Sequence, residues 1–457
     1  MSAHPHELAE RALAAATGPC VALVSNRSEA NLRWAANTLT TNGLTSSQDV
    51  TVIAVHGGDQ VGVVSRSGVD VDSIAALVAD AEAAARASAP AEDAAELVPG
   101  PADDAFGEAP GEVTAGDLAA LAQSLGSALE DARSGDRELF GYAEQTLHTT
   151  YLASSTGLRA RYALPAATVQ LNGKSHQRSR SAWAGAAAQA LDAVDVAALA
   201  AEVTDRLGWQ ARRLDAEAGR YETILPPSAV ADLMAYTLWS SDARSAHEGR
   251  SVFGRKGGGT RVGDQLSGQH LRLFSDPTAA GMQTAPVVMV GGSSPFGSVF
   301  DNGLPVTRQS WIEDGVLRAL PTTRHSAGLA GIADTQAADN LVMEVDGGRG
   351  SAMDLVADLD DGLLLTCLWY IREVDPQTLL LTGLTRDGVY KVEGGEVIGA
   401  VTNFRFNESP VDLLDRIVAA GTTVPTLGRE FGDYLPRTAM PALRVRGFNC
   451  SSVSQAS

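Results

Sequence analysis

The sequence predicts an α+β protein, with N-terminal segments built on antiparallel strands and a large, mostly β C-terminal domain against which a helix packs. Apolar, β-branched runs flank short turn signals near the N-terminus, as in antiparallel hairpins. Strand-like runs recur between turn signals from about residue 260 to residue 406. One long helical pattern separates these two regions. The 457 residues are enough for two or three domains.

Residues 1–87 read as an N-terminal α+β segment. We expect a helix at 6–16, strands at 20–25 and 29–34, a turn over 37–43, strands at 50–55 and 60–65, and a helix at 71–87. Asn42-Gly43 is a strong hairpin signal because its residues readily adopt positive φ.

Residues 88–114 are predicted to form an acidic, proline-rich linker. No lysine or arginine occurs between Arg86 and Arg133, and this composition is typical of a solvated, mobile connection.

Residues 115–219 read as a second α+β segment. We expect a helix at 118–132, a strand at 138–153, paired strands at 158–162 and 168–172, and a helix at 186–207. Asn172-Gly173-Lys174-Ser175 resembles the end of a phosphate loop, but Thr168 stands where that loop requires glycine. A hairpin turn is therefore predicted there.

The stretch 225–259 is the element around which we expect the chain to be organised. Two prolines precede Ser228, which can cap a helix start. Apolar residues then recur at helical spacing as far as Leu238. His247 and Glu248 come at the predicted end of this helix, and a glycine run follows.

The rest of the domain 220–457 is predicted to form a closed or strongly curved sheet. The expected strands are 271–274, 287–290, 316–320, 341–345, 363–371, 389–392, 397–404 and 442–448, with one helix at 411–420.

The His247-Glu248 pair is half of a zinc-peptidase motif. In that chemistry two histidines hold the metal and the glutamate deprotonates water. The second histidine would fall at Ser251 or Val252, and neither side chain replaces a histidine ligand. The structural interpretation is a histidine at the negative end of a helix dipole.

Several stretches together resemble the TldD/PmbA family. They are 33–43, the helix start and glycine-rich run within 225–264, 300–303, 311–317, 382–383 and 389–397. The resemblance extends over nearly the whole chain. The family pairs a zinc subunit, TldD, which carries H-E-x-x-x-H, with a metal-free subunit, TldE (also called PmbA). The missing second histidine places this sequence on the TldE-like side.

The resemblance implies a barrel-like assembly that encloses a chamber, with unfolded or flexible peptides as substrates. It implies a TldD-like partner subunit that holds the zinc, and neither a cofactor nor a catalytic residue in this chain. A late cysteine completes the metal site of the zinc subunit, but Cys450 does not lie in that context.

A basic cluster follows the helix on glycine-rich backbone and could receive a peptide carboxylate, since arginine offers a bidentate fork. With the half motif it gives the candidate substrate-binding residues His247, Glu248, Arg250, Arg255, Lys256 and Arg261. The structural alternative is that cations are expected at a helix C-terminus.

Composition narrows the function further. The net charge of −20 argues against binding to nucleic acid or to an anionic membrane. Three scattered cysteines support neither a disulfide framework nor a cysteine zinc site. With no signal peptide and no transmembrane run, the sequence predicts a cytoplasmic protein. Pro295 stands where a serine nucleophile elbow centred on Ser293 would need glycine.

Two alternatives stay open. The chain could be a stand-alone homodimeric binding or scaffold protein. It could also be an independent hydrolase or biosynthetic enzyme that uses the same cavity.

Overall fold

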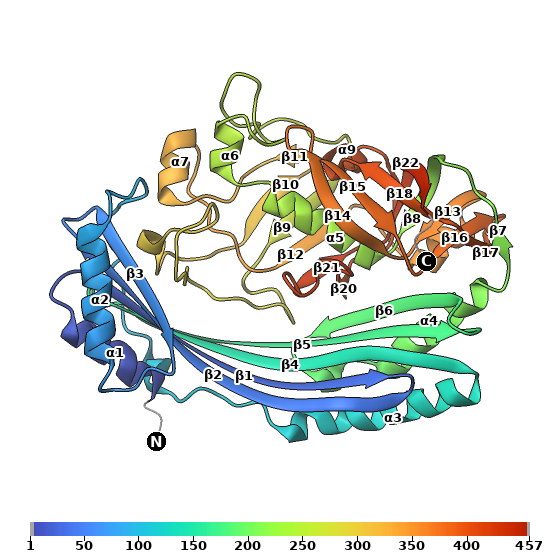
Figure 1. Ribbon diagram of the computed structural model, residues 1–457. Helices are drawn as coiled ribbons and strands as arrows, with labels where there is room; N and C mark the ends of the chain where they lie inside the picture. The colour runs from blue at the N-terminus through green and yellow to red at the C-terminus, as the bar shows by residue number, and fades with distance from the viewer. Residues whose placement is uncertain (1–3, 455–457) are drawn as a thin grey trace.

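The computed structural model describes residues 4–454, which form three β-sheets with helices packed against them. The predicted α+β class is confirmed. A long N-terminal sheet runs beneath the C-terminal part of the chain, so the molecule has two layers that face each other along most of their length (Figure 1).

The N-terminal sheet has six antiparallel strands in the order β3-β2-β1-β4-β5-β6. Their bounds are β1 (Cys20–Ala35), β2 (Thr38–His56), β3 (Gln60–Ser67), β4 (Arg137–Ser154), β5 (Arg159–Ser175) and β6 (Arg180–Ala188). Because β1 pairs with β4, strands from before and after residues 88–114 belong to one sheet.

Helices cover this sheet in two places. At one end lie α1 (Pro5–Ala15) and α2 (Ile74–Ala87); further along lie α3 (Ala119–Ser134) and α4 (Val196–Trp209). In Figure 1, α3 and α4 lie beneath the sheet, on the side away from the C-terminal part. The other face is therefore free to form a wall opposite the C-terminal sheets.

The two predicted Asn-Gly turns are wrong. Both dipeptides lie inside long strands, β2 and β5. The first chain reversal is at Ala36 and Asn37, with φ of 46° and 62°, and the Asn37 side chain donates to the carbonyl oxygen of Arg137 at 2.6 Å. The second lies at residues 176–178. Pairing along continuous strands overrides the local turn preference of Asn-Gly.

The predicted helix at 186–207 begins later than expected. Its first residues complete β6, and α4 starts after Asp195, whose carboxylate accepts the backbone N–H of Ala198 at 2.9 Å. The expected strands at 158–162 and 168–172 are one strand, β5, and do not pair with each other. A three-residue 3₁₀ turn, η3 (Leu191–Ala193), joins β6 to α4.

Residues 88–114 are packed against both layers. They contain the 3₁₀ turn η1 (Asp104–Gly107), and η2 (Ala115–Leu118) follows. Phe106 is 7% exposed and lies 5.9 Å from the ring of Tyr151. The Asp93 carboxylate accepts hydrogen bonds from the hydroxyls of Ser293 and Ser298, at 2.7 and 2.8 Å. These contacts pack residues 88–114 against the rest of the protein, whereas their composition indicates a solvated connection.

The C-terminal part contains two sheets. One has the order β11-β10-β9-β12-β21-β20, with bounds β9 (Leu271–Ser275), β10 (Gln309–Glu313), β11 (Val316–Leu317), β12 (Leu341–Val345), β20 (Val424–Thr426) and β21 (Thr438–Met440). The other has the order β14-β15-β18-β22-β8-β13-β16-β17-β7. Its bounds are β7 (Arg213–Leu214), β8 (Gly219–Leu225), β13 (Asp361–Leu365), β14 (Leu368–Asp375), β15 (Leu380–Thr385), β16 (Val389–Glu393), β17 (Glu396–Val401), β18 (Asn403–Glu408) and β22 (Leu443–Ser454), with β19 (Ile417–Ala420) paired to β22.

The organising helix packs into the core shared by these two sheets, as expected. It is α5 (Pro227–Trp239), and its apolar residues join side chains of both sheets in the largest hydrophobic cluster. Ser228 does not cap it, because Pro226 takes the N-cap position. The helix also ends before His247, which belongs to a separate short helix, α6 (Ala243–His247).

Four other C-terminal expectations need correction. Residues 287–290 form only an isolated bridge. The expected helix at 411–420 divides into α9 (Pro410–Leu414) and β19, and the expected strands at 363–371 and 397–404 each divide into two. The remaining helices are η4 (Val299–Asp301), α7 (Arg324–Ala330) and α8 (Ala352–Ala357).

Candidate functional site

The half motif predicted from sequence lies on α6 and the loop after it, at the upper rim of the molecule in Figure 1. The Asp242 carboxylate caps α6 by accepting the backbone N–H of Ser245 at 2.8 Å. His247 is the last residue of this helix, and its carbonyl oxygen accepts the backbone N–H of Gly259 at 2.9 Å. The glycine run is thereby folded back against α6.

Glu248 is held between two arginines of its own segment. Its carboxylate accepts a hydrogen bond from the Arg244 guanidinium at 3.1 Å and another from the Arg250 guanidinium. Hydrogen bonds from Arg250 and then Arg244 lower the pKa of Glu248 below its ordinary value. Glu248 is therefore a salt-bridged carboxylate rather than a free base.

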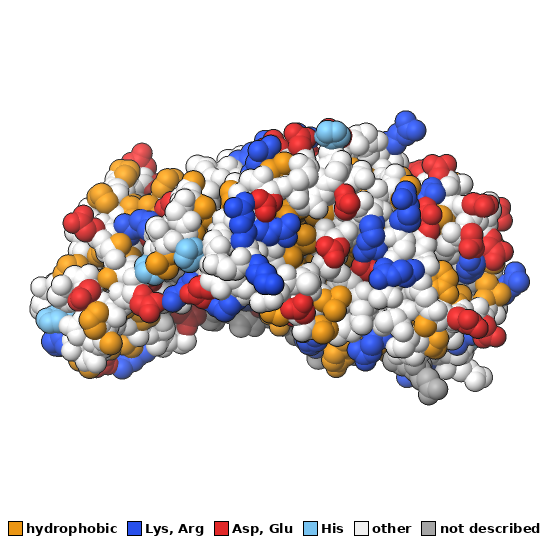
Figure 2. Space-filling model, turned by 90° about the horizontal axis from the view of Figure 1, so that it is seen from above, with side chains coloured by type: hydrophobic (Ala, Val, Ile, Leu, Met, Phe, Trp, Pro, Cys, Tyr) orange, Lys and Arg blue, Asp and Glu red, His pale blue; other side chains and the backbone are white. Residues whose placement is uncertain are grey.

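The rest of the basic cluster is also largely compensated by local acids. Arg255 pairs with Asp264 at 2.5 Å, and Arg261 lies 3.6 Å from the same carboxylate. Lys256 is exposed on the glycine run. Basic and acidic side chains are interspersed over the face seen in Figure 2. The structure brings these residues together, while their role in substrate binding stays a prediction.

The surroundings of His247 do not fit a metal ion. Ser251 and Val252, where a second histidine would fall, are both buried. Within residues 4–454, no group of three or more His, Cys, Asp or Glu side chains could hold a metal. Burial raises the pKa of the Cys20 and Cys450 thiols to about 12, so neither is poised as a thiolate ligand.

A cleft of about 820 Å³ lies beside the C-terminal half of α5, and sequence reasoning missed it. Its walls come from α5, from β14 and from the loop between β20 and β21. The lining residues are Trp239, Trp369, Tyr370, Arg372, Glu430, Phe431, Asp433 and Tyr434. Five aromatic rings therefore share one cavity with one arginine and two carboxylates.

The position of the loop depends on Asp232 of α5. This carboxylate is fully buried and accepts the backbone N–H groups of Arg429, Glu430 and Phe431, each at 3.0 Å. Burial raises the pKa of Asp232 to about 7, although the three N–H donors act in the opposite direction. The helix thus fixes the loop that carries half of the cleft wall.

The opposite wall is built on a β-bulge. The pairing of β14 with β15 shifts between Trp369 and Arg372, and Tyr370 there has φ of 52°. The Glu430 carboxylate accepts the backbone N–H of Tyr370 at 3.1 Å and pairs with Arg372 at 3.2 Å. Positive φ is costly for a tyrosine and is often found beside functional sites.

Arg429 connects the cleft to the N-terminal sheet. Its guanidinium lies 4.6 Å from the ring centre of Trp369 and 5.2 Å from that of Trp183 on β6. It also donates to the side chain of Gln170 on β5 at 3.3 Å. The two layers are therefore in contact at the edge of the cleft.

A groove of about 690 Å³ lies between the layers next to the cleft. Strands β1, β2, β4 and β5 line one side, and residues 432–437 with Asp339 line the other. Asp433 and Tyr434 line both the cleft and the groove. A third cavity, of about 300 Å³, shares His148, Leu164 and Asp339 with the groove. The three cavities therefore adjoin one another.

Asp339 and Arg437 mark the middle of this system. Arg437 is buried and donates to the carbonyl oxygen of Pro165 at 2.9 Å. Asp339 lies 3.9 Å from Arg437 and keeps 61% of its side chain open to the cavity. Desolvation by the surrounding protein raises the pKa of the Asp339 carboxyl, while the positive charge of Arg437 acts in the opposite direction. Asp339 is thus a carboxylate on the cavity wall.

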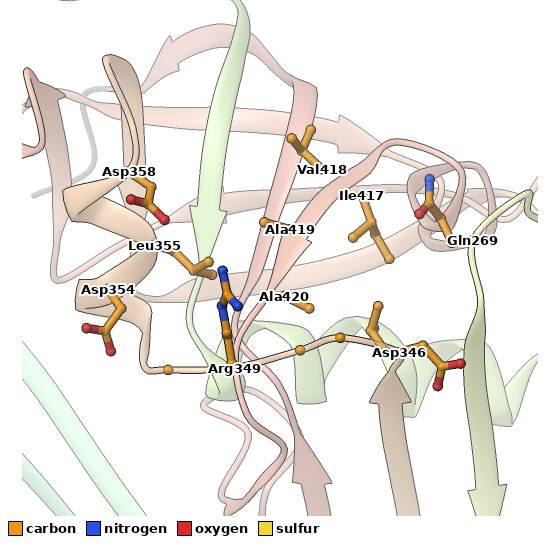
Figure 3. A pocket seen from close by; sticks show the side chains of 14 residues that line it. Gln269, Asp346, Arg349, Asp354, Leu355, Asp358, Ile417, Val418, Ala419 and Ala420 are labelled. Atoms are coloured by element: carbon orange, nitrogen blue, oxygen red, sulfur yellow. The ribbon is translucent and has the colours of Figure 1, made fainter.

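A separate hollow of about 650 Å³ lies among the loop after β12, α8 and β19 (Figure 3). Arg349 and the carboxylates of Asp346, Asp354 and Asp358 line it. Asp354 accepts the backbone N–H of Ser351 at 2.6 Å, and the Ser351 hydroxyl accepts the backbone N–H of Asp354, so the two residues form the capping box at the start of α8. This hollow shares no lining residue with the three adjoining cavities.

Family models match two parts of the chain. Residues 218–452 match the PmbA/TldA metallopeptidase C-terminal domain, and residues 20–85 match the PmbA/TldA metallopeptidase domain 1. No curated protein matches the chain.

Solved structures show the same fold over almost the whole length. TldE from Thermococcus kodakarensis is 16% identical, with 97% of this chain and 98% of that chain covered and a TM-score of 0.80. A putative modulator of a DNA gyrase from Thermotoga maritima is 15% identical, with coverage of 97% and 99% and a TM-score of 0.78. One from Bacteroides thetaiotaomicron is 13% identical, with coverage of 98% of both chains and a TM-score of 0.77.

Among the helices of the described residues, none is long and apolar enough to cross a membrane.

Proposed function

The chain belongs to the PmbA/TldD metallopeptidase family, and we propose that it is a TldE-like, non-catalytic subunit that walls a peptide chamber. The zinc and the water-activating glutamate would be supplied by a TldD-like partner subunit. The TldE-like fold supports this proposal. So does the residue set around His247, which offers no second histidine among the buried neighbours Ser251 and Val252.

One observation carries the proposal: the aromatic cleft adjoins a groove between two layers, and Asp433 and Tyr434 line both. An unfolded or flexible peptide could lie along such a groove, whereas a folded domain would not enter it. Holding a peptide in a fixed orientation lowers the entropic part of the barrier. This chain would contribute binding and orientation, while the partner would contribute the metal chemistry.

The six residues predicted from sequence have a secondary place in this proposal. His247, Glu248, Arg250, Arg255, Lys256 and Arg261 lie on the α6 rim. A peptide carboxylate that bound there would compete with Glu248 and Asp264 for the arginines. We expect their contribution to be small, because exposed ion pairs are worth little.

Reconstitution with a TldD-like subunit tests the proposal. Peptide cleavage would be measured for this chain, for the partner, and for the mixture. We expect activity only in the mixture, reduced by Tyr434→Ala in the cleft and mostly retained by His247→Ala and Glu248→Ala. Loss of a general base typically costs a hundredfold or more, so full activity of this chain alone that Glu248→Ala abolishes would overturn the proposal.

The same experiment separates the alternatives. A chain that forms only homodimers and never changes the activity of the partner would be a binding or scaffold protein. A chain active by itself would be an independent enzyme using the same cavity. We place the subunit in the cytoplasm, where three buried, unpaired cysteines would stay reduced.

A further inference from the structure

The cleft beside α5 has the features of a cation-binding subsite. Trp239, Phe431 and Tyr434 form a chain of edge-to-face rings, with Trp239 lying 5.0 Å from Phe431 and 6.3 Å from Tyr434 between ring centres. Tyr434 is 75% exposed, so a ligand can reach it. Aromatic faces attract cations through their quadrupole, and several rings together form the cages that bind ammonium groups.

The charges of the cleft favour the same ligand. Arg372 and Glu430 pair with each other at 3.2 Å, so their charges largely cancel. Asp433 has no arginine, lysine or histidine within 4.0 Å in the described part of the chain; its carboxylate accepts only an amide N–H of Gln170, at 3.3 Å. Among the residues that line the cleft, Asp433 is therefore the charged side chain without an ion-pair partner, and it lies next to exposed aromatic rings. The nearby Arg429 guanidinium stacks on Trp369 and donates to Gln170, whose amide N–H in turn donates to Asp433.

The wider electrostatic field acts in the same direction. The chain carries a net charge of −20, which raises the local concentration of cations near its surface. The adjoining groove is lined by four carboxylates, Asp49, Glu144, Asp339 and Asp433, and by two arginines, Arg27 and Arg437, so acidic side chains outnumber basic ones there. An anionic side chain would meet more carboxylates than arginines among the residues that line each cavity. A neutral side chain would gain only apolar contact.

From these contacts we propose that the cleft binds the cationic side chain, lysine or arginine, of a peptide that lies in the groove. The ring faces of Trp239 and Tyr434 contact the charged end, and Asp433 accepts its N–H groups. Because Asp433 and Tyr434 line both cavities, a peptide backbone in the groove can direct one side chain into the cleft. This subsite rests on the proposed peptide-holding function and names the substrate class of that site.

Binding to this chain alone tests the proposal without requiring the partner or any cleavage. The probe is a five-residue alanine peptide with lysine at its centre, acetylated and amidated at its ends. Its matched peptides carry norleucine or glutamate in place of lysine. Tryptophan fluorescence reports on Trp239 and Trp369, and calorimetry gives the affinity. We expect lysine to bind roughly 5- to 30-fold more tightly than norleucine, with the preference decreasing at high salt.

Variants identify the subsite. Asp433→Asn and Tyr434→Ala should each reduce the lysine preference, while Tyr434→Phe, which keeps the ring, should retain it. Asp205→Asn removes one charge from the exposed face of α4 and should change nothing. Both Asp433 and Tyr434 are exposed, so these variants are expected to fold.

Each outcome has a defined meaning. Equal binding of lysine and norleucine, or a preference that Asp433→Asn and Tyr434→Ala leave intact, would overturn the subsite. If a peptide with a free N-terminus and no lysine binds as well as the lysine peptide, the cleft recognises the α-amino group, and the side-chain proposal is wrong. If lysine is preferred but the mixture with a TldD-like subunit cleaves nothing, the subsite stands and the proposed function fails.

Discussion

The carboxylate of Asp232 accepts the backbone N–H of Phe431 at 3.0 Å, although the two residues are 199 positions apart in the sequence. The same carboxylate also accepts the N–H groups of the two preceding residues. This contact joins the buried helix α5 to the loop that lines the aromatic cleft. The stability of the C-terminal core and the shape of the candidate site therefore depend on the same side chain.

The first prediction concerns this contact. Asp232→Ala would leave three N–H groups without their acceptor, and an unsatisfied buried group costs about 1–3 kcal/mol. We expect a loss on the order of 3 kcal/mol in the free energy of unfolding, measured with denaturant, and weaker peptide binding. Asp205→Ala on exposed α4 should stay within about 0.5 kcal/mol of the unmodified chain. Equal stability of the two variants would show that Asp232 does not hold the loop.

The second prediction concerns pH. Burial raises the pKa of Asp232 from 3.8 to about 7, so between these values the folded chain binds a proton that the unfolded chain releases. This group's contribution to stability is complete below about pH 4 and is lost as the pH rises through about 7. We expect the stability difference between the unmodified chain and Asp232→Asn, which cannot titrate, to fall over that range and to level off above it.

A difference that stays constant between pH 4 and 7, and rises with pH only below about 4, would contradict this prediction. It would mean that the three N–H donors outweigh burial and keep the carboxylate ionised. Unfolding at a series of pH values for both proteins, at one ionic strength, provides the measurement.

Residue periodicity was enough to predict the α+β class and most strands, because each strand carries its own apolar pattern. It could not place the turns. Asn42-Gly43 and Asn172-Gly173 look like hairpin turns, but both lie within strands that continue past them because neighbouring strands pair with them residue by residue. Asn-Gly does favour a turn, but pairing with the neighbouring strands stabilises the extended conformation more.

The cleft was harder to predict for a different reason. Its rings come from α5, β14 and the loop after β20, which are separated by more than a hundred positions at the widest. Only the fold brings Trp239 and Tyr434 together. A weak signal was present in Trp369-Tyr370, since adjacent aromatic residues in a strand put one ring on the exposed face. Asp232 was hidden within an apolar helical pattern, where a buried carboxylate indicates a specific partner.

The third prediction concerns metal. Because residues 4–454 contain no group of three or more suitable ligands, the purified chain should hold no stoichiometric zinc after incubation with zinc and gel filtration. His247→Ala should give the same result. Elemental analysis that found about one zinc per chain, lost in His247→Ala, would mean that this chain holds a metal site of its own.

The fourth prediction concerns residues 88–114. Their composition makes them a natural site for proteolysis, but Phe106 anchors them, with the Arg159 guanidinium 6.0 Å from its ring centre. We expect the unmodified chain to resist cleavage here and Phe106→Ala to be cut much faster, because loss of a buried Phe costs about 3–5 kcal/mol. Limited proteolysis followed by mass spectrometry locates the cuts.

Glu112→Ala is the matched control for this segment, because Glu112 is exposed and should not affect the rate of cleavage. Rapid cleavage of the unmodified chain within 88–114, unchanged by Phe106→Ala, would show that Phe106 does not anchor the segment.

The last prediction concerns Tyr370, whose φ of 52° is a conformation that costs a non-glycine residue roughly 1–2 kcal/mol. Its side chain is 58% exposed, so Tyr370→Gly removes little buried surface and relieves the backbone. Tyr434→Gly is the matched variant, because it also removes an exposed ring of the cleft but relieves no positive φ. We expect Tyr370→Gly to be about 1–2 kcal/mol more stable than Tyr434→Gly in denaturant unfolding, while both bind the lysine peptide less tightly than the unmodified chain. That pattern would mean that the strained backbone of the bulge is what places the Tyr370 ring in the cleft. Equal stability of the two variants, or unchanged binding by Tyr370→Gly, would show that the positive φ serves only the course of the strand.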